Sequence, residues 1–463
     1  TNVSGDDIQP EITEVFNWKS KKVSDSSGIV PNPFLFALTE GTHTLRLTGS
    51  RGRIAIHKII LKPELNPIPY NEYIAQYNNK KNNEDAETVF VEGEGYTSKS
   101  DLTVKAENDR SSPLTYPQSS SAIKLNTVGG KNWRKPGESV SWNIKIPANG
   151  FYEIAPRFRQ NTADGIFTSR KLYIDGVIPF SEAEALRFGY NSKWQLKSLG
   201  KDNSAYLFYL TEGDHTVTLE AVIGDASEII NIATRTMDEL YKVYNNILMI
   251  TGTSPDIYRD YNFTERIPKE IQILKEQKKQ LQKIVDLVAE ESDIGGSYLS
   301  VIKKIIFQLD SMSSKPESIS KHFEQFKANL GSLGSWLMEA TNQPLQIDRI
   351  YFIPSGEEKP KAEVDFFSKL VFNAKCFLAT FFKDYSSIDE SETETGNRIK
   401  VWIQSGRDQA MIMRNLIDTD FSVKNKIAVD LELVSVGTLL PSVLSGTGLL
   451  LLKLLHSFLC PFQ

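Results

Sequence analysis

The sequence predicts a multidomain α+β protein made of β-sandwich modules, a helical bundle region and the start of an α/β lobe. Short alternating strands with glycine-containing turns fill the first half of the 463-residue chain. Longer segments with apolar residues at three- and four-residue spacing follow them and predict helices. A strand, a helix and a second strand come last, which is the pattern of an α/β layer.

An internal repeat organises the first half of the chain. Residues 36–47 and 208–219 share a short strand, a Glu-Gly turn and an alternating strand. Glycine at such a turn supplies the positive φ that a tight connection needs. The repeat therefore predicts two copies of one β module. The predicted segments are a partial sandwich module over 1–65, a linker over 66–86 and a complete module over 87–226.

The second module shows the features of an all-β sandwich. Short strand-like runs are separated by turns that contain Pro-Gly, Asn-Gly or Asp-Gly. His43 and His215 each follow the repeated turn, and their matched positions favour a packing or hydrogen-bonding role. Asp175 lies in an Asp-Gly turn, where forming the turn is its expected role. The strand-like runs are 88–92, 139–146, 151–158, 171–174 and 206–210.

A helical domain is predicted over 227–390. Ile271, Leu274 and Leu281 illustrate the spacing that places apolar residues on one face of a helix. The favoured interpretation is a bundle whose apolar faces meet, and the alternative is an exposed coiled coil that binds a partner. The predicted helices are 226–250, 268–291, 298–312, 316–340 and 364–385.

The start of an α/β lobe is predicted over 397–448. Residues 399–403 and 427–434 have the pattern of strands, and 407–417 has the pattern of a helix between them. Such a succession places the two strands parallel in one sheet. The last residues, 449–463, form an apolar tail that is too short and too interrupted to span a bilayer.

Composition and motifs argue against several classes of function. The formal charge of -5, from 53 Lys and Arg against 58 Asp and Glu, argues against a nucleic-acid-binding protein. Two cysteines exclude a disulfide framework and a cysteine-rich zinc site, and the five histidines do not fall at metal-ligand spacing. The sequence contains no phosphate-binding loop and no nucleophile-elbow pattern. We therefore expect a protein that is not an enzyme and uses no metal or other cofactor.

Aromatic residues of the second module are candidates for stacking on a sugar. One face of a pyranose ring is apolar, so it packs on an aromatic ring while nearby polar groups bind the hydroxyls. Trp133 and Trp194 lie in polar, turn-like stretches and are the predicted stacking residues. Trp142 alternates with Val140 and Ile144, so we expect it to point into the core.

Two polar stretches are further candidates for ligand contacts. Arg407, Asp408 and Gln409 begin the predicted helix that follows the 399–403 strand. In α/β sheets, ligands collect at the carboxyl ends of strands beside helix N-termini. Simple helix capping by these residues is the alternative. The polar cluster over 159–161 either binds a ligand or caps the end of its strand.

The segment 399–448 resembles the opening of family 1 extracellular solute-binding proteins, the capture subunits of ABC sugar importers. The resemblance rests on Val401-Trp402, the following Gly-Arg-Asp-Gln, Phe421 after the helix, and the glycine-containing motif over 439–448. The upstream region resembles the long amino-terminal extension of large solute-binding proteins, in which carbohydrate-binding-like sandwiches accompany a helical region. The matching stretches are 125–130, 159–161, 173–176, 251–252, 255–261 and 343–345.

The resemblance implies jelly-roll, galactose-binding-like sandwich modules and a periplasmic-binding-protein-like lobe. It also implies a carbohydrate ligand, ABC permease subunits as partners, and no nucleic acid. The implied location is the extracellular face of the cell membrane, with lipoprotein-type anchoring through a signal segment not present in this chain. The Pro-Asp typical of the family does not follow Gly448, so we expect an aberrant tail and a chain truncated before its remaining lobes.

These features predict non-catalytic capture of a sugar or oligosaccharide for an ABC importer. The alternative is a cell-surface glycan-binding or adhesion protein that acts through its β-sandwich modules. A glycoside hydrolase accessory chain is a weaker alternative, because no acid and base pair stands out among the many carboxylates.

Overall fold

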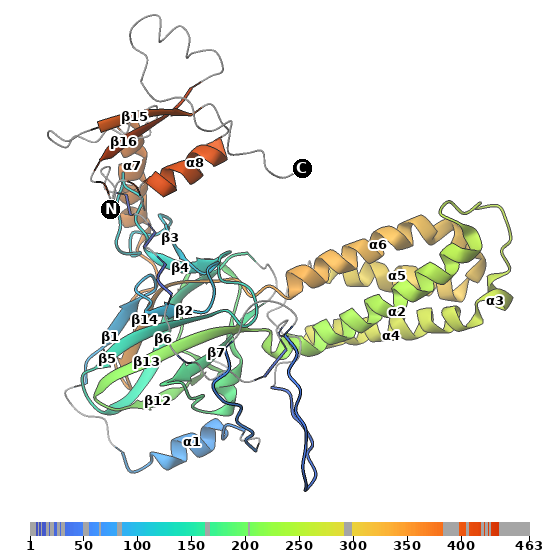
Figure 1. The fold of residues 1–463 in the computed structure, drawn as a ribbon, viewed down its shortest axis with the longest axis horizontal. Coiled ribbons are helices and arrows are strands. Elements are labelled where there is room, and N and C mark those ends of the chain that lie inside the picture. The colour runs from blue at the N-terminus through green and yellow to red at the C-terminus, as the bar shows by residue number, and fades with distance from the viewer. Residues whose placement is uncertain are drawn as a thin grey trace, which may run out of the picture. The chain divides into compact units, whose positions relative to one another are not determined.

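Figure 1 shows the fold of the chain in a computed structural model. The residues described are 6–7, 9–10, 12–14, 18, 23–25, 28, 33–49, 55–63, 66–80, 86–162, 167–201, 204–290, 299–382, 398–403, 407–417, 421, 425 and 427–434. The chain divides into two compact units, which we describe separately. The larger unit comprises Asn17–Lys105 and Val128–Ala362, and the smaller comprises Thr1–Phe16, Ala106–Thr127 and Glu363–Gln463.

The larger unit contains the predicted β-sandwich, with two antiparallel sheets. The first sheet has the strand order β12-β6-β14-β4, with β1 paired to β14 and β9 paired to β6. The second has the order β2-β5-β13-β7-β8. Their bounds are β1 Val89–Glu92, β2 Ser98–Lys99, β4 Thr127–Gly130, β5 Ser139–Ile146, β6 Gly150–Gln160, β7 Thr168–Ile174, β8 Leu186–Phe188, β9 Asn191–Leu196, β12 Leu207–Leu210, β13 Gly213–Val222 and β14 Leu345–Pro354. Three shorter strands are β3 Ala106–Glu107, in the smaller unit, and the β10 Gly200–Lys201 and β11 Ser204–Ala205 pair.

An interior strand of the first sheet comes from beyond the helical region of the sequence. β14 pairs with β6 along most of its length, and its other edge pairs with β4 and β1. The sequence-based boundaries placed these residues in a helical domain, whereas the structure assigns them to the sandwich. Pro344 disfavours helical backbone just before them, and the strand is rich in β-branched and aromatic residues. The helices therefore form an insertion between two strands of one sandwich.

The two ends of this insertion meet at one residue of the second sheet. The backbone N–H of Ser169, on β7, donates to Gln343 Oε1 at 2.8 Å. Gly224 lies against the same residue, where an added Cβ would be 2.8 Å from Ser169 Oγ. Gly224 also has a φ of +60°, so both its conformation and this close approach favour glycine. The sandwich thus holds the start and the end of the insertion side by side.

The sandwich core is shared by strands from both sides of the insertion. Ile347, Ile350 and Phe352 of β14 belong to one buried cluster with the aromatic residues of the earlier strands. Those partners include Trp133, Trp142, Tyr152, Phe158, Phe180, Phe188 and Phe208. Burial of an aromatic or large aliphatic side chain contributes about 1.5–3 kcal/mol. The sandwich therefore lacks a substantial part of its core until β14 is in place.

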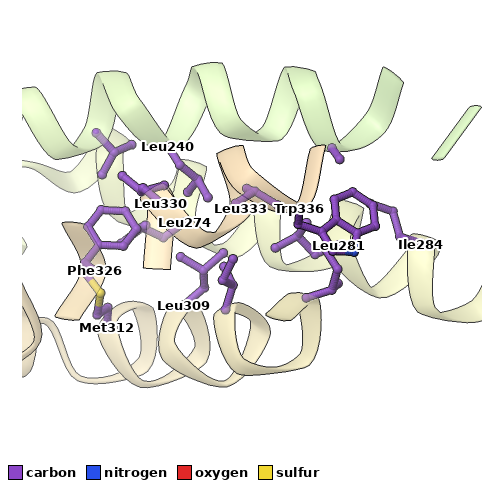
Figure 2. Close-up of a cluster of buried hydrophobic side chains, with 14 of the residues drawn as sticks. Leu240, Leu274, Leu281, Ile284, Leu309, Met312, Phe326, Leu330, Leu333 and Trp336 are labelled. Atoms are coloured by element: carbon purple, nitrogen blue, oxygen red, sulfur yellow. The ribbon is translucent and has the colours of Figure 1, made fainter. Parts of the chain in front are cut away.

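The inserted segment is the predicted helical bundle. Figure 2 shows Leu240 of α2, Leu274 of α4, Leu309 of α5 and Leu330 of α6 converging on a shared apolar interior. The apolar faces therefore meet each other, which confirms the bundle and not the exposed coiled coil. The helix bounds are α2 Ser227–Thr251, α3 Phe263–Arg266, α4 Pro268–Glu290, α5 Ser300–Ser314 and α6 Ile319–Ala340. Short 3-10 turns lie at Ser181–Glu184, Gly224–Ala226 and Pro316–Ser318.

The segment 66–86, predicted as a linker, contains a docked helix. α1 spans Tyr70–Gln76, and Tyr73 is buried in the sandwich core cluster. The hydroxyls of Tyr70 and Tyr73 accept hydrogen bonds from the backbone N–H groups of Leu207 and Tyr209. Both donors lie on β12, which ends the strand order of the first sheet, so α1 covers backbone donors of an outer strand. Buried Tyr73 and half-buried Tyr70 therefore make this polar segment part of the fold.

The first copy of the repeat does not show the expected partial sandwich. Of the residues described between 6 and 63, none belongs to a strand. Leu45 and Leu47 are more than half exposed there, although their counterparts in the second copy are core residues of β13. A strand needs neighbouring strands to pair with and an apolar face to cover, and an isolated hairpin is marginal in water.

The repeated turn itself is the same in both copies. Gly41 has a φ of +132° and Gly213 a φ of +129°. In each copy the histidine that follows lies within hydrogen-bonding distance of a threonine carbonyl, at 2.7 Å for His43 and 2.8 Å for His215. This contact confirms the hydrogen-bonding role predicted for both histidines.

The smaller unit contains the predicted strand, helix and strand. β15 Arg398–Ile403 and β16 Ala428–Leu433 pair in parallel, and α8 Arg407–Leu416 lies between them in the sequence. A small apolar cluster of Ile403, Ile417, Val429 and Leu431 joins the helical segment to the strands. The predicted helix before them is present as α7, Phe366–Phe382. The predicted apolar tail, 449–463, lies outside the described residues.

We predict that Phe352→Ala destabilises the sandwich by about 3–5 kcal/mol, the usual cost of removing a buried phenyl ring. Phe352 is fully buried in the core, although the helices separate it from the other sandwich strands in sequence. Hydrogen exchange followed by mass spectrometry should show lost protection in β4 and β6. Phe323→Ala, in the bundle core, is the matched control and should chiefly expose α2 and α6. Unchanged protection of β6 in Phe352→Ala would contradict the assignment of β14.

Candidate functional site

Trp133 is a core residue and not an open stacking platform. Its side chain is fully buried, and its indole N–H donates to the carbonyl of Glu138 at 3.0 Å. The guanidinium of Arg170, also fully buried, lies 4.3 Å from the ring centroid. The indole ring is thus enclosed by protein and cannot reach a ligand. The prediction that Trp133 stacks on a glycan is wrong. Its polar sequence neighbourhood is explained by the turn that surrounds it.

Trp142 points into the core as predicted. It has no exposed surface, and its indole N–H donates to the carbonyl of Gly93 at 3.0 Å. Its ring centroid lies 6.3 Å from that of Trp133, so the two indoles form part of the same interior.

Trp194 lies on the outer face of the first sheet, the side that does not face the second sheet. Core residues Ile154 and Phe158 alternate on β6 with Arg157 and Arg159, whose guanidinium groups lie 4.9 Å and 4.8 Å from the Trp194 ring. Only 3% of Trp194 is exposed. Its indole is therefore not open to a sugar in this structure, which corrects the prediction that it is an available stacking residue.

Side chains of the polar cluster predicted over 159–161 form hydrogen bonds within the protein. Arg159 Nη2 donates to Gln346 Oε1, on β14, at 2.7 Å. Gln160 is buried, and its side-chain oxygen accepts the backbone N–H of Thr162 at 3.1 Å. These contacts favour the interpretation that the cluster caps the strand end and ties it to β14.

A buried ion pair crosses from β6 to β14. Arg157 Nη1 lies 2.6 Å from Asp348 Oδ2, and both side chains are essentially unexposed. Arg157 Nε also donates to the carbonyl of Ala362 at 3.0 Å. Asp348 stands at the irregularity where the β14 register shifts, between Ile347 and Arg349. Removing one member of such a pair leaves a buried charge, so the pair makes this register costly to change.

Burial raises the pKa of Asp348 to about 6, although the positive charge of Arg157 opposes the shift. Its second oxygen, Oδ1, is buried without a hydrogen-bond partner among the described residues. Burial also raises the pKa of Glu94 to about 8, and the negative charge of Asp348 contributes to this shift. Its Oε2 is likewise buried without a partner in the described part of the chain. Asp348 and Glu94 thus each have a raised pKa and one buried carboxylate oxygen without a hydrogen-bond partner among the described residues.

An exposed aromatic patch lies beside this buried cluster. The rings of Phe90, on β1, and Tyr351, on β14, have centroids 5.7 Å apart, and Phe90 is 47% exposed. The guanidinium of Arg349 lies 4.8 Å from the Phe90 ring, and Arg349 Nε donates to Glu92 Oε2 at 2.7 Å. An aromatic surface next to charged hydrogen-bonding groups has the chemistry that sugar recognition needs. We name Phe90, Glu92, Arg349 and Tyr351 the outer-face patch.

Sequence reasoning missed the outer-face patch because half of it comes from β14. Phe90 and Glu92 alternate within a predicted strand, which could have placed them on one face. Arg349 and Tyr351 have the same alternation, but the strand that carries them was not expected. The register pairs Phe90 with Tyr351 and Glu92 with Arg349. These strands lie far apart in the sequence, so local patterns do not predict their pairing.

Asp175 and His215 form a turn-stabilising pair. His215 Nδ1 lies 2.7 Å from Asp175 Oδ2, and Asp175 Oδ1 accepts the backbone N–H of Thr216 at 2.8 Å. Asp175 has a φ of +51°, a conformation that short polar residues tolerate in turns. The predicted turn-forming role of Asp175 is confirmed.

The predicted solute contacts Arg407, Asp408 and Gln409 form the first turn of α8, the helix that follows β15 in the sequence. Gln409 is exposed, and the side chains of Arg407 and Asp408 lie outside the described atoms. The backbone thus has the arrangement in which α/β proteins bind ligands, at the carboxyl end of a parallel strand and a helix N-terminus.

Among the residues that the structure describes, no group of three or more His, Cys, Asp or Glu side chains is arranged to hold a metal ion. None of the helices in the described ranges is both long and apolar enough to cross a membrane.

Residues 228–342 match the family model described as "Bacterial solute-binding protein, 4-helix bundle domain". This range coincides with the insertion between β13 and β14. No curated protein matches the chain. The bundle is therefore similar to a helical domain found in bacterial solute-binding proteins.

Solved structures similar to this chain include sugar-binding modules and a sugar-active enzyme. A family 35 carbohydrate-binding module from Clostridium thermocellum is 16% identical in sequence. The match covers 30% of this chain and 88% of the module, with a TM-score of 0.21. The C-terminal CBM6 of the laminarinase LamC from Zobellia galactanivorans is also 16% identical, and the match covers 29% of this chain and 90% of that module, with a TM-score of 0.20. A Paenibacillus cycloisomaltooligosaccharide glucanotransferase is 19% identical, covers 34% of this chain but 20% of its own length, and has a TM-score of 0.23.

We predict that the stability of the sandwich falls as the pH rises, because of Glu94. Its pKa is raised from 4.5 to about 8 in the folded protein, so the folded state binds more protons than the unfolded state between these values. Stability is therefore lost as the pH rises from about 4.5 to about 8. Glu94→Gln should have a higher urea midpoint than the natural protein at pH 8 and a similar one at pH 4.

Glu92→Gln is the matched control for this prediction. Glu92 is a strand carboxylate of the same region, paired with Arg349, and its replacement leaves Glu94 in place. The control should keep the loss of stability between pH 4.5 and 8. A Glu94→Gln protein with the same pH profile as the natural protein would show that Glu94 is not buried as described.

Proposed function

We propose that this chain is an extracellular solute-binding protein of a carbohydrate ABC importer, which captures a sugar or oligosaccharide without chemical change. The observation that carries the proposal is the match of the inserted bundle, 228–342, to a domain of bacterial solute-binding proteins. The parallel β15-α8-β16 unit supports it, since ligands of α/β lobes bind at the carboxyl ends of such strands.

In this proposal, Arg407, Asp408 and Gln409 bind hydroxyl groups of the sugar. They lie at the N-terminus of α8, where backbone N–H groups without helical partners are also available. Charged side chains give stronger hydrogen bonds than neutral ones, about 1.5–3 kcal/mol each, and this suits a solute rich in hydroxyl groups. The protein then delivers its ligand to ABC permease subunits at the extracellular face of the membrane, where lipoprotein-type anchoring holds it.

The alternative proposal is a cell-surface glycan-binding protein that acts through the sandwich. The outer-face patch favours it, because exposed Phe90 lies beside the Arg349–Glu92 pair. Trp133 and Trp194 do not contribute to this alternative, since both are buried. The patch, and not the predicted tryptophans, is thus the surface on which an adhesion function depends.

We predict that the full chain binds an oligosaccharide and that Asp408→Ala weakens its affinity at least tenfold. Loss of a charged hydrogen bond of about 1.5–3 kcal/mol corresponds to a change of tenfold or more. Isothermal titration against a panel of plant and bacterial oligosaccharides measures this. Glu276→Ala, on the exposed side of α4, is the control and should leave the affinity unchanged.

A second variant separates the two proposals. Tyr351→Ala removes one ring of the outer-face patch and leaves α8 untouched. If Tyr351→Ala abolishes binding while Asp408→Ala does not, the adhesion proposal replaces the importer proposal. Absence of binding to every saccharide tested would overturn both.

A further inference from the structure

An extended segment crosses the outer face of the first sheet after β14 ends. Residues 355–362, which we name the strap, are the last residues of the larger unit and contain no helix or strand. Lys359 Nζ lies 2.9 Å from Glu153 Oε2. The carbonyl of Ala362 accepts a hydrogen bond from Arg157 Nε at 3.0 Å. The strap therefore runs along β6 from Glu153 to Arg157.

The strap covers Ala155, the small residue between these two contacts. Side chains of a strand alternate between its faces, so Ala155 lies on the outer face with Glu153 and Arg157. It does not belong to the core cluster between the two sheets, yet it has no exposed surface. The strap is the segment that contacts β6 on either side of it. We name Glu153, Ala155 and Arg157 the covered strip.

The covered strip adjoins the outer-face patch. In the sheet register, Tyr351 lies opposite Ala155, and Arg349 lies opposite Arg157. Phe90 lies opposite Tyr351 in turn. Side chains directly opposite each other on one face have Cβ atoms about 4.5–5.5 Å apart. Removing the strap would therefore join the strip and the patch into one surface across three strands.

The strap is held mainly by side-chain contacts. Residues 358–362 form no backbone-to-backbone hydrogen bond within the described part of the chain. Most strap residues are exposed, and the side chain of Lys359 is 42% exposed. Ion pairs that reach solvent in this way add little stability. A segment with few buried contacts and few backbone hydrogen bonds opens locally at low cost.

We propose that the strap is a self-inhibitory cover over a glycan-binding surface formed by Arg157, Phe90 and Tyr351. Two aromatic rings beside a guanidinium suit a pyranose, which has an apolar face and a rim of hydroxyl groups. A sugar hydroxyl oxygen accepts from Arg157 Nε in place of the Ala362 carbonyl, so the exchange leaves no buried donor unpaired. The inference rests on the proposal that the sandwich binds a glycan, and adds that the strap must lift first.

Charge reversal at Lys359 tests the proposal in the full chain. Lys359→Glu places a second carboxylate beside Glu153 and should open the strap. Hydrogen exchange followed by mass spectrometry should then show faster exchange at 355–362, with the protection of β14 retained. Isothermal titration with cellohexaose, xylohexaose and laminarihexaose should show binding tighter by about fivefold or more, because a surface open only part of the time has a proportionally lower apparent affinity.

Lys361→Glu is the matched control. It makes the same charge change at an exposed strap lysine away from the Glu153 contact, and it should keep the exchange rate and affinity of the natural protein. Glu153→Lys combined with Lys359→Glu reverses the ion pair and should restore slow exchange of the strap. These two variants separate loss of the ion pair from a general effect of charge.

The outcomes distinguish the strap from the glycan-binding function. If Lys359→Glu does not bind more tightly, while the natural protein binds and Tyr351→Ala does not, the strap is not a cover and glycan binding by the sandwich stands. Slow exchange of the strap in Lys359→Glu also overturns the proposal, because a segment that does not lift exposes nothing. Absence of binding by both the natural protein and Lys359→Glu overturns the strap proposal and sandwich glycan binding together.

Discussion

The pairing of β14 with β6, β4 and β1 is the interaction on which the larger unit depends. An interior strand must be supplied by a segment that follows the helical insertion. If the insertion were an unstructured loop, closing it would cost conformational entropy, although that cost rises slowly with loop length. A folded bundle whose two ends meet at Ser169 removes most of this cost, because it presents Gln343 where β14 must start. The bundle thus acts as a closed insertion that the sandwich accommodates.

Polar groups on β14 make its position specific. Slipping a strand by one residue would move its apolar side chains to the wrong face. The irregularity at Asp348 and the buried ion pair with Arg157 add a further cost to any other register, because a displaced Asp348 would be a buried and unpaired charge. Burial raises the pKa of Asp348, so the attraction of Arg157 offsets only part of the cost of burying this carboxylate. The same register brings the outer-face patch together.

Local patterns predicted those parts of the fold that depend on local interactions. The helix at 268–291 was predicted almost to the residue, because its apolar spacing is contained in its own sequence. The parallel pair of β15 and β16 was predicted because a strand, helix and strand in succession permit little else. β14 was not predicted, since its partners on β6 lie almost two hundred positions away. Trp133 was misjudged for the same reason: its neighbours in sequence are polar, but Arg170 and the core bury it. In the candidate site, local spacing predicted that Arg407, Asp408 and Gln409 lie at a helix N-terminus. The outer-face patch could not be predicted in this way, because it depends on the pairing of β1 with β14.

The central claim is that the bundle is an insertion and that the sandwich is one domain made from both flanking segments. Replacing 228–342 with a short Gly-Ser linker tests it most directly. The account predicts that this shortened chain unfolds in one cooperative transition and protects the amides of β6 and β14 from hydrogen exchange. A shortened chain that lacks protected β14 amides, or that has no cooperative transition, would contradict it and would show that the helices are required to form the sandwich.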